Sequence, residues 1–304
     1  MKAVRIHERA GAEALVVEEA PYPKAAENDV IVRVHAASFT PGELDWPGTW
    51  EDRAGRDRTP VIPGHEVSGE VAELGYGTTG LTVGQRVFGL TDWTRDGTLA
   101  EYVAVEARNL APLPAAVDHV TAAALPMAGL TARQALFDHG GLRAGQTVLV
   151  HGAGGAVGHV AVQLAREAGA VVVGTGRERD RAAVLEAGAE RFVTLDGRFE
   201  EEVGQVDVVM DVIGGDILDR SAAVVRAGGT LVTISAPPKV RPVDGRAVFF
   251  VVEADRRQLE ELAGWVREGR LVPRVGSVRP LDETRDAFLG KGRVPGKSVV
   301  RVVE

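Results

Sequence analysis

The sequence has no cysteine, no long apolar run and no cluster of positive charge. Without cysteine there is no disulfide scaffold, cysteine-ligated zinc lobe, iron–sulfur cluster or thiol nucleophile. No stretch of about 20 residues is apolar enough to cross a bilayer. The 35 Lys and Arg residues against 43 Asp and Glu residues give a net charge of −8, without a basic stripe. We therefore expect neither a nucleic-acid nor a membrane partner.

The amino-terminal residues also lack the apolar core of a signal peptide, which predicts a cytoplasmic protein. What is present is an ordinary globular composition, with 304 residues of which 45% are hydrophobic and 26% are charged. This length is about twice that of a typical single domain, so we expect two domains.

The first third of the chain has the pattern of β structure. Short runs rich in β-branched residues or alternating in polarity occur at Val30–Ala37, 67–71, Arg86–Phe88 and Leu99–Val105. Gly, Pro, Asp and Thr interrupt them at short intervals. This pattern predicts a small β-barrel or sandwich over residues 1–117.

From residue 118 to residue 257 the pattern alternates between strands and helices, which indicates βαβ units, a parallel sheet and an α/β fold. A further helix is expected at Asp255–Arg267 and a terminal strand at Lys297–Val303, so residues 258–304 are expected to return to the β domain. The predicted strands are Thr147–His151, Val171–Val173, Arg191–Val193, Asp207–Met210, Leu231–Ile234 and Ala247–Val252, and the predicted helices are Ala156–Ala168, Asp180–Ala187 and Asp216–Val225.

A glycine-rich turn joins the first of these strands to its helix. It reads His151-Gly152-Ala153-Gly154-Gly155-Ala156-Val157-Gly158. Gly155 allows backbone N–H groups to approach a pyrophosphate, Gly158 allows the helix to pack closely on the strand, and the helix N-terminus favours negative charge. In this strand–turn–helix context the motif predicts a dinucleotide site.

The end of the next strand indicates which dinucleotide is bound. It reads Gly174-Thr175-Gly176-Arg177, without the acidic residue that holds the ribose 2′-hydroxyl of NAD. Arg179 and Arg181 follow, and a guanidinium group suits a 2′-phosphate, so the pattern favours NADPH. Alternatively these arginines belong to a solvated helix start, and the choice between Arg177 and Arg181 as the phosphate ligand stays open.

Several segments, in one order along nearly the whole chain, resemble the medium-chain dehydrogenase/reductase superfamily, and more closely its zinc-free quinone oxidoreductase (ζ-crystallin-like) branch. The resemblance implies a GroES-like β domain, a Rossmann domain with an active-site cleft between them, and a homodimer. The matching segments are 34–39, Pro63-Gly64-His65-Glu66-Val67-Ser68-Gly69, 84–88, 122–126, Gly129-Leu130-Thr131-Ala132, the glycine turn, 207–211, 226–230 and Gly296-Lys297.

The resemblance also implies site residues. Thr131 corresponds to a threonine near the nicotinamide, unless its hydroxyl is structural. Three further segments correspond to loops that wall the cofactor: Ile213-Gly214-Gly215, Ser235-Ala236 and Phe249-Phe250-Val251. Phe249 and Phe250 equally suit core packing. The implied cofactor residues are Thr131, Gly154, Gly155, Ala156, Val157, Gly158, Thr175, Gly176, Arg177, Arg181, Ile213, Gly214, Ser235, Ala236, Phe249, Phe250 and Val251.

Gly64-His65-Glu66 also resembles the signature of the zinc-dependent members of the superfamily. Their cysteine ligand corresponds here to Thr40, which is a poor zinc ligand. We therefore expect no metal, with His65 in a structural role. The loop departs from the zinc-free branch as well, because Thr40 stands where Asn is frequent and Glu43-Leu44-Asp45-Trp46 stands where a tyrosine is usual.

Without a Lewis acid, reduction of an activated double bond is easier than oxidation of an alcohol. The expected reaction is hydride transfer from NADPH to a quinone or an α,β-unsaturated carbonyl. Thr40 and the Trp46 indole are the candidate hydrogen-bond donors, unless they serve only loop packing. A zinc-dependent alcohol dehydrogenase, an enoyl-thioester reductase and a non-catalytic NADPH-binding sensor remain as alternatives. The dimer is expected to form through edge strands near 231–234 or 247–252.

Overall fold

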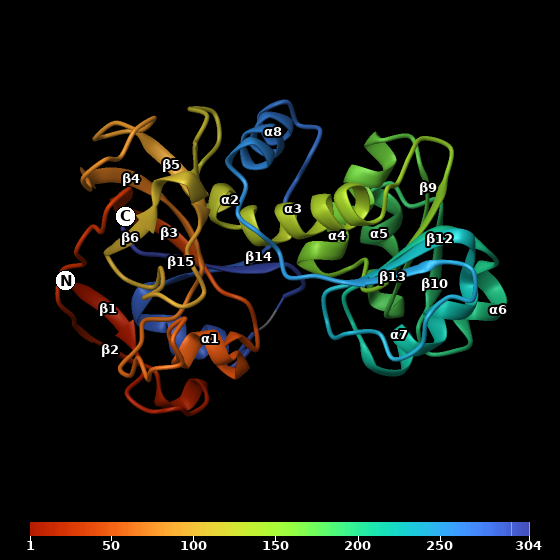
Figure 1. Ribbon diagram of the computed structural model, residues 1–304, viewed down its shortest axis with the longest axis horizontal. Coiled ribbons are helices and arrows are strands. Elements are labelled where there is room, and N and C mark those ends of the chain that lie inside the picture. The colour runs from red at the N-terminus through yellow and green to blue at the C-terminus, as the bar shows by residue number, and fades with distance from the viewer. Residues whose placement is uncertain (293, 304) are drawn as a thin grey trace. The chain divides into compact units, whose positions relative to one another are not determined.

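The computed structural model describes residues 1–292 and 294–303, and the chain divides into two compact units (Figure 1). The first unit comprises Met1–Met127, Ala254–Arg267 and Arg274–Glu304. The second comprises Ala128–Glu253 and Glu268–Pro273. The domain limits expected at 117 and 257 stay predictions.

The first unit is built on a mostly antiparallel sheet with the order β14-β15-β3-β4-β5-β7, in which β6 also pairs with β3. A separate two-stranded ribbon joins β1 to β2. The strands are β1 Lys2–Arg5, β2 Val16–Glu19, β3 Asp29–Ser38, β4 Glu66–Leu74, β5 Arg86–Leu90, β6 Tyr102–Glu106, β7 Leu110–Pro112, β14 Val275–Pro280 and β15 Lys297–Arg301, and the helices are α1 Pro47–Trp50, α2 His119–Ala123, α8 Arg256–Arg267 and α9 Thr284–Phe288.

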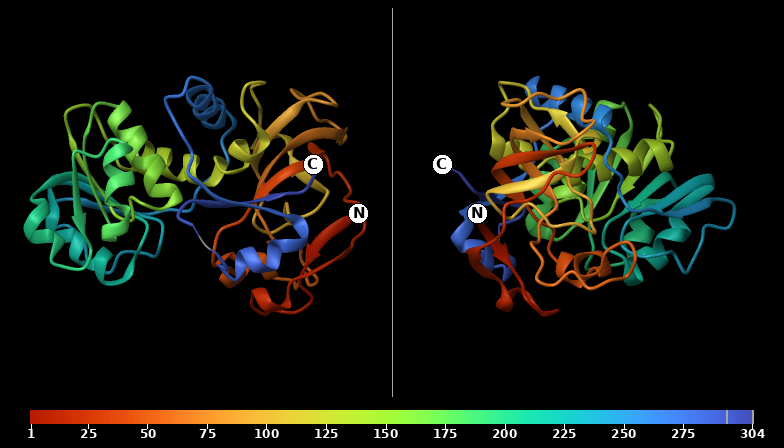
Figure 2. Two further views of the ribbon diagram at one scale, coloured as in Figure 1. Left: turned by 180° about the vertical axis from the view of Figure 1, so that it is seen from behind. Right: turned by 60° about the vertical axis from the view of Figure 1, so that its left-hand side comes forward.

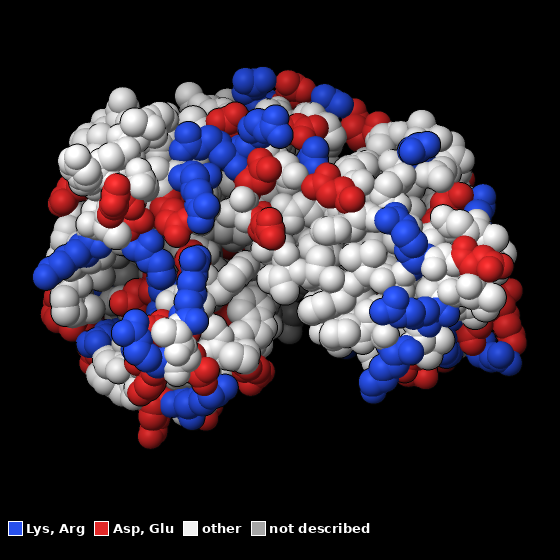
Figure 3. Space-filling model, viewed as in Figure 1, with Lys and Arg blue, Asp and Glu red and all other residues white. Residues whose placement is uncertain are grey.

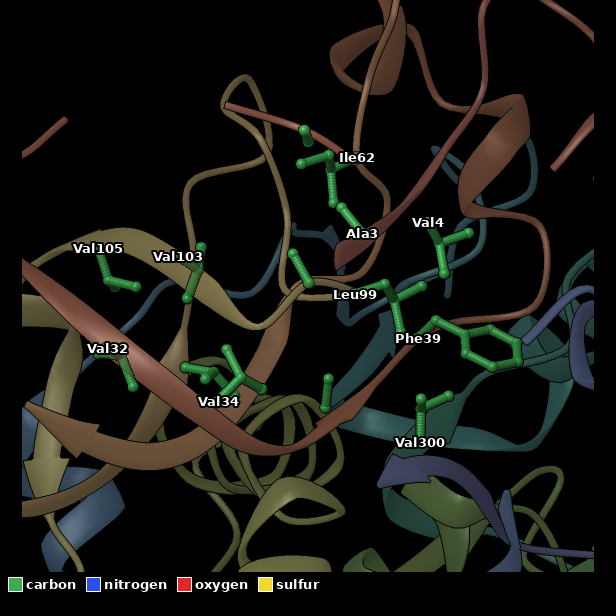
Figure 4. Close-up of a cluster of buried hydrophobic side chains, with 14 of the residues drawn as sticks. Ala3, Val4, Val32, Val34, Phe39, Ile62, Leu99, Val103, Val105 and Val300 are labelled. Atoms are coloured by element: carbon green, nitrogen blue, oxygen red, sulfur yellow. The ribbon is translucent and has the colours of Figure 1, made fainter. Parts of the chain in front are cut away.

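The β-branched runs of the sequence form the core of this unit. Val32 and Val34 of β3 share a hydrophobic cluster with Val103 and Val105 of β6, and Phe39 closes it after β3 ends (Figure 4). All five side chains are buried. Burial of a valine or phenylalanine side chain stabilises a fold by about 1.5–3 kcal/mol. This packing fixes the end of β3, from which the loop at residues 39–46 leaves.

The second unit is a doubly wound parallel sheet with the order β10-β9-β8-β11-β12-β13, which confirms the predicted fold class. Helices α4 and α5 lie on one face and α6 and α7 on the other (Figures 1 and 2). The strands are β8 Thr147–Val150, β9 Val171–Gly176, β10 Arg191–Thr194, β11 Val206–Asp211, β12 Val225–Thr233 and β13 Arg246–Phe249, and the helices are α4 Ala156–Glu167, α5 Arg181–Glu186, α6 Phe199–Val203 and α7 Gly215–Ser221. Helix α3, Pro126–Arg133, passes from the first unit to the second and continues as a π-helical segment, Gln134–His139.

Two expectations about the second unit are wrong, and one helix, α6, was not predicted. The helix expected over Asp216–Val225 ends at Ser221, and Val225 begins β12, because the strand extends to pair with Val206. Helix α6 is short, and the three residues between Phe199 and Val203 are glutamates. Two apolar residues are too few to produce a helical periodicity in the sequence. The segment 231–234 is not an edge, because β12 lies between β11 and β13, and β13 is the outer strand.

Candidate functional site

The glycine-rich turn joins β8 to α4 as the sequence predicts. Gly152 has a positive φ of 70°. A Cβ atom at Gly158 would lie 2.2 Å from the carbonyl oxygen of Gly152, so only glycine lets α4 pack this closely on the turn. Gly155 is the N-cap of α4, carries no side chain to bind the first N–H groups, and is exposed. These N–H groups and the positive end of the helix dipole suit a phosphate group.

The end of β9 lies beneath this turn. The backbone N–H of Ala153 donates to the carbonyl oxygen of Thr175 at 2.9 Å, and the Thr175 hydroxyl is 2.8 Å from Nδ1 of His151. Burial lowers the pKa of His151 to about 4, so this imidazole is neutral. Its Nε2 lies 2.9 Å from the hydroxyl of Ser221. The Thr175 side chain therefore supports the turn from below, and Gly176 follows it, also buried.

The two candidate arginines after β9 differ in their surroundings. The Arg181 guanidinium is bound to Glu178 at 2.6 Å, donates to the carbonyl oxygen of Phe192 at 3.2 Å and lies over the ring of that residue. Arg177 is exposed, and its side chain has no hydrogen-bond or ion-pair partner among the residues that the structure describes. Arg177 is thus the arginine available for an anionic ligand.

A buried carboxylate organises two of the loops expected to wall the cofactor. Asp211, at the end of β11, accepts hydrogen bonds from the backbone N–H of Gly214 at 3.0 Å and from the hydroxyl of Thr233 at 2.8 Å. The hydroxyl of Ser235 also donates to it at 3.2 Å. Gly214 has a φ of 80°, and a Cβ there would lie 2.6 Å from Oγ of Ser235. Asp211 therefore brings the loop that carries Ile213 and Gly214 together with the one that carries Ser235 and Ala236.

The third loop follows β13 and is held by the π-helical segment. The Gln134 side chain donates to the carbonyl oxygen of Glu253 at 2.8 Å and accepts from the N–H of the same residue at 3.1 Å. The Phe250 ring packs on His139, with centroids 4.4 Å apart. Phe249 and Val251 are exposed, whereas Phe250 and Thr131, one turn before Gln134, are buried. Phe250 thus has the core position that was the alternative in the sequence.

In the first unit, the loop after β3 is anchored by a buried carboxyl group that the sequence did not indicate. Glu43 is fully buried and accepts hydrogen bonds from the backbone N–H of Thr40 at 2.9 Å and of Gly64 at 2.6 Å. Burial raises the pKa of Glu43 to about 7, against the opposing effect of these two hydrogen bonds and of the Lys297 charge. Glu43 therefore ties the loop that carries Thr40 and Trp46 to the segment that carries His65.

A buried ion pair between Lys297 and Glu66 lies beside Thr40. Lys297 forms an ion pair with Glu66, and both side chains are buried. Glu66 also accepts hydrogen bonds from the hydroxyl of Ser38 at 2.5 Å and from the N–H of Met127 at 2.9 Å. In the sequence, Lys297 belongs to the matching segment Gly296-Lys297, but no local pattern indicates that it pairs with Glu66. The pair places one cation and one anion next to the predicted donor.

His65 lies in an aromatic group rather than in a ligand cluster. Its ring stacks on Trp46 with centroids 5.9 Å apart and meets Trp93 edge-on at 4.9 Å. Burial lowers the pKa of His65 to about 3, and the charges of Arg58 and Lys297 act in the same direction. Its Nδ1 lies 3.4 Å from the Thr91 hydroxyl, and its buried Nε2 has no hydrogen-bond partner in the described part of the chain.

Comparisons with known proteins show which family the chain matches. Residues 26–115 match the family model described as "Alcohol dehydrogenase GroES-like domain", and residues 187–300 match that of "Zinc-binding dehydrogenase". The chain is 30% identical to 2-methylene-furan-3-one reductase of Solanum lycopersicum, with 92% of this chain and 74% of that protein covered. It is 29% identical to quinone oxidoreductase of Pongo abelii, with 94% and 92% covered.

The chain belongs to the medium-chain dehydrogenase/reductase superfamily, as a quinone oxidoreductase-like member. The structure of the quinone oxidoreductase from Coxiella burnetii matches it with a TM-score of 0.90 at 28% identity, covering 100% of this chain and 99% of that one. Members of this superfamily bind a nicotinamide cofactor. The protein is therefore an oxidoreductase that acts on a small molecule.

Zinc does not fit the donor set at His65 of this medium-chain dehydrogenase/reductase. A tetrahedral zinc site needs three or four good ligands. In residues 1–292 and 294–303, the acidic or histidine groups close enough to share an ion are His35, Glu70 and His119, and His65 is not among them. At that other group the Arg86 guanidinium donates to His119, which opposes a second cation.

The last two observations concern membrane-spanning helices and surface charge. Among the described helices, none combines the length and the apolarity needed to span a bilayer. On the face shown in Figure 3, Lys and Arg side chains are interspersed with Asp and Glu side chains.

Proposed function

We propose that the protein is a zinc-independent, NADPH-dependent reductase of quinones or α,β-unsaturated carbonyl compounds. The observation that carries this proposal is the pairing of the Thr40 hydroxyl with the buried Lys297 ammonium, together with a neutral His65 imidazole that belongs to no group of three potential metal ligands in residues 1–292 and 294–303. The relatives named quinone oxidoreductase and 2-methylene-furan-3-one reductase support the same substrate classes.

The residues present fit a bound NADPH. The uncapped start of α4 suits the pyrophosphate, and the Arg177 side chain, which has no partner in the described residues, suits the 2′-phosphate. The proposed cofactor residues are Thr131, Gly154, Gly155, Ala156, Val157, Gly158, Thr175, Gly176, Arg177, Ile213, Gly214, Ser235, Ala236, Phe249, Phe250 and Val251, whereas Arg181 ties the segment after β9 to β10 through Glu178 and Phe192.

The nicotinamide, when bound, supplies the hydride. Addition of hydride to an enone or quinone leaves negative charge on the substrate oxygen. The Thr40 hydroxyl and the Trp46 indole N–H are proposed to donate hydrogen bonds to this oxygen, because donors already held in place stabilise a developing charge. Glu43 positions both residues, because its carboxyl group accepts from the N–H of Thr40 and its carbonyl oxygen accepts from the N–H of Trp46 at 3.1 Å.

The proposal is tested with a panel of quinones, enones, enals, enoyl thioesters and primary alcohols, each assayed with NADPH or NADP⁺ and with the corresponding NAD forms. Turnover of a quinone or enone with NADPH, unchanged by a chelator, is the expected result. Oxidation of alcohols that a chelator abolishes would show a zinc enzyme. NADPH binding without turnover of any acceptor would show a sensor.

A homodimer and a cytoplasmic location complete the proposal. Strand β13, as the outer strand of its sheet, is the edge at which a second copy would add. Sedimentation equilibrium is expected to give twice the chain mass of 32.1 kDa.

A further inference from the structure

Lys297 is a buried ammonium whose position is fixed from several sides. Its residue is 6% exposed. Its partner Glu66 is completely buried and is itself held by Ser38 and by the backbone of Met127. A buried ion pair is costly to maintain unless its remaining hydrogen-bonding capacity is used. After the ion pair with Glu66 has formed, the ammonium still has N–H groups that can donate to another acceptor.

The Lys297 ammonium also donates to the Thr40 hydroxyl, the group that is proposed to donate a hydrogen bond to the substrate. Nζ of Lys297 donates to Oγ1 of Thr40 over 3.5 Å, which is longer than the usual N–H···O hydrogen bond. Catalytic hydrogen bonds are often long before the substrate binds and shorten in the complex. The Thr40 backbone is fixed independently, by Glu43. Because the Thr40 oxygen accepts from Lys297, the hydroxyl hydrogen is free to donate to another group.

We propose that Lys297 returns a proton to the Thr40 hydroxyl, so that Thr40 and Lys297 form the proton relay of the reductase. This inference rests on the proposed function. Lys297 acts through Thr40 and is a positioning and proton-supplying residue, not one that touches the substrate. Glu66 and Ser38 hold its ammonium in place for this transfer.

In the reduction of an enone, the proposed relay supplies the proton that neutralises the substrate oxygen after hydride addition. Hydride forms a C–H bond at the β-carbon, and the C=C electron pair moves through to leave the carbonyl oxygen as an enolate. The Thr40 O–H bond breaks as the proton passes to this oxygen, and a Lys297 N–H bond breaks to restore the hydroxyl. Water then protonates the Lys297 amine, and the enol becomes the saturated ketone. The nicotinamide is the group oxidised and the enone is the group reduced.

Lys297→Arg separates the proton from the charge. Arginine keeps the positive charge and the ion pair with Glu66 but does not release a proton in proteins. We expect kcat for 3-buten-2-one with NADPH to fall about 100-fold, the lower end for general acid catalysis. The KM for the enone, the Kd for NADPH by nicotinamide fluorescence and the Tm are expected to stay unchanged. Lys291→Arg, at an exposed ion pair with Asp286, is the matched control.

A double variant distinguishes a relay from a structural role. If both residues move the same proton, Thr40→Val combined with Lys297→Arg is expected to be no slower than Thr40→Val alone. A solvent deuterium isotope effect on kcat is expected in the wild type and lost in both single variants. Additive losses in the double variant, or a Lys297→Arg enzyme as fast as the wild type, would overturn the relay.

A Lys297→Arg variant that does not fold and a wild-type protein that is inactive are two further outcomes, and each has its own interpretation. If Lys297→Arg does not fold, Lys297→Met with Glu66→Gln removes both buried charges together, and the same loss of kcat with a cooperative melt is expected. Normal kcat in that variant would exclude the relay. A wild-type protein that reduces no acceptor removes the proposed function and the relay together, whereas an active wild type with a normal Lys297→Arg variant removes the relay alone.

Discussion

At the scale of single residues, the first unit carries its chemistry on buried polar groups whose neighbours are distant in sequence. Glu43 binds the N–H of Gly64, and Glu66 binds Ser38 and Lys297. Each of these groups has satisfied hydrogen bonds, which is the condition under which buried polar groups specify one structure. The exceptions include Nε2 of His65, Nε2 of His35 and Oγ1 of Thr98, which are buried without a hydrogen-bond partner in the residues that the structure describes.

The raised pKa of Glu43 predicts a pH-dependent stability. Burial raises this pKa from 4.5 to about 7, so the folded state binds more protons than the unfolded state between these values. The free energy of unfolding is therefore expected to fall as pH rises through this window, by an amount on the order of 3 kcal/mol. Glu43→Gln removes this titration, and urea unfolding at pH 4.5 and pH 7.5 measures the difference from the wild type.

The control for this experiment is Glu8→Gln, at an exposed position. It is expected to keep the wild-type pH dependence. An unchanged pH dependence in Glu43→Gln would show that the Glu43 carboxyl is ionised at little cost and that its burial is compensated.

The choice of cofactor is also a matter of single residues. Arg177→Ala is expected to weaken NADPH binding about 10- to 100-fold while leaving NADH binding unchanged, because it removes a charge-assisted contact with the 2′-phosphate. Arg181→Ala is the matched comparison, because its guanidinium is bound to Glu178 and to the carbonyl oxygen of Phe192. Fluorescence titration of both variants with both cofactors gives the Kd values. NADPH preference that survives Arg177→Ala would contradict the assignment.

At the scale of elements, the turn between β8 and α4 depends on contacts that a side chain would block. The Cβ of an alanine at Gly158 would be 2.2 Å from the carbonyl oxygen of Gly152, which is backbone and cannot move aside cheaply. The helix must then shift away from the turn that is proposed to hold the pyrophosphate.

Gly158→Ala is therefore expected to destabilise the protein by about 1–3 kcal/mol and to weaken NADPH binding at least 10-fold. Gly264→Ala in α8 is the control, since a Cβ there meets nothing within 4 Å. That substitution is expected to stabilise by about 0.5–1 kcal/mol. Urea unfolding and NADPH titration measure both effects, and a Gly158→Ala protein with normal stability and affinity would show that the turn relaxes.

At the scale of the whole molecule, each compact unit contributes a different part of the proposed chemistry. The second unit holds the residues suited to NADPH, and the first holds Thr40, Lys297 and the aromatic group around His65. The proposed zinc independence rests on the first unit, because His65 belongs to no group of three potential ligands close enough to share an ion in residues 1–292 and 294–303.

We therefore expect the purified protein to contain far less than one zinc per chain, even after growth with added zinc. Prolonged treatment with 1,10-phenanthroline is expected to leave kcat and Tm unchanged, since no step of the proposed reaction needs a Lewis acid. Metal analysis by inductively coupled plasma mass spectrometry checks the content. Stoichiometric zinc whose removal abolishes activity would refute a zinc-free mechanism.

The sequence by itself determined the fold class, the glycine turn and the alternation of strands and helices. These depend on local patterns: the β-branched runs of β3, the strand–turn–helix around Gly155 and the period of α4. It also placed Arg177 directly after β9, because that position follows from the strand end.

Only the tertiary structure decided which polar groups meet. Lys297 and Thr40 are 257 residues apart in sequence, and β15 pairs with β3 to bring them together. The burial that raises the pKa of Glu43 and the contacts that occupy Arg181 but leave Arg177 exposed likewise arise from packing. Sequence periodicity reports which face of an element is buried. Hydrogen bonds between distant segments depend on which strands pair and on loop conformation, and a local pattern does not determine these.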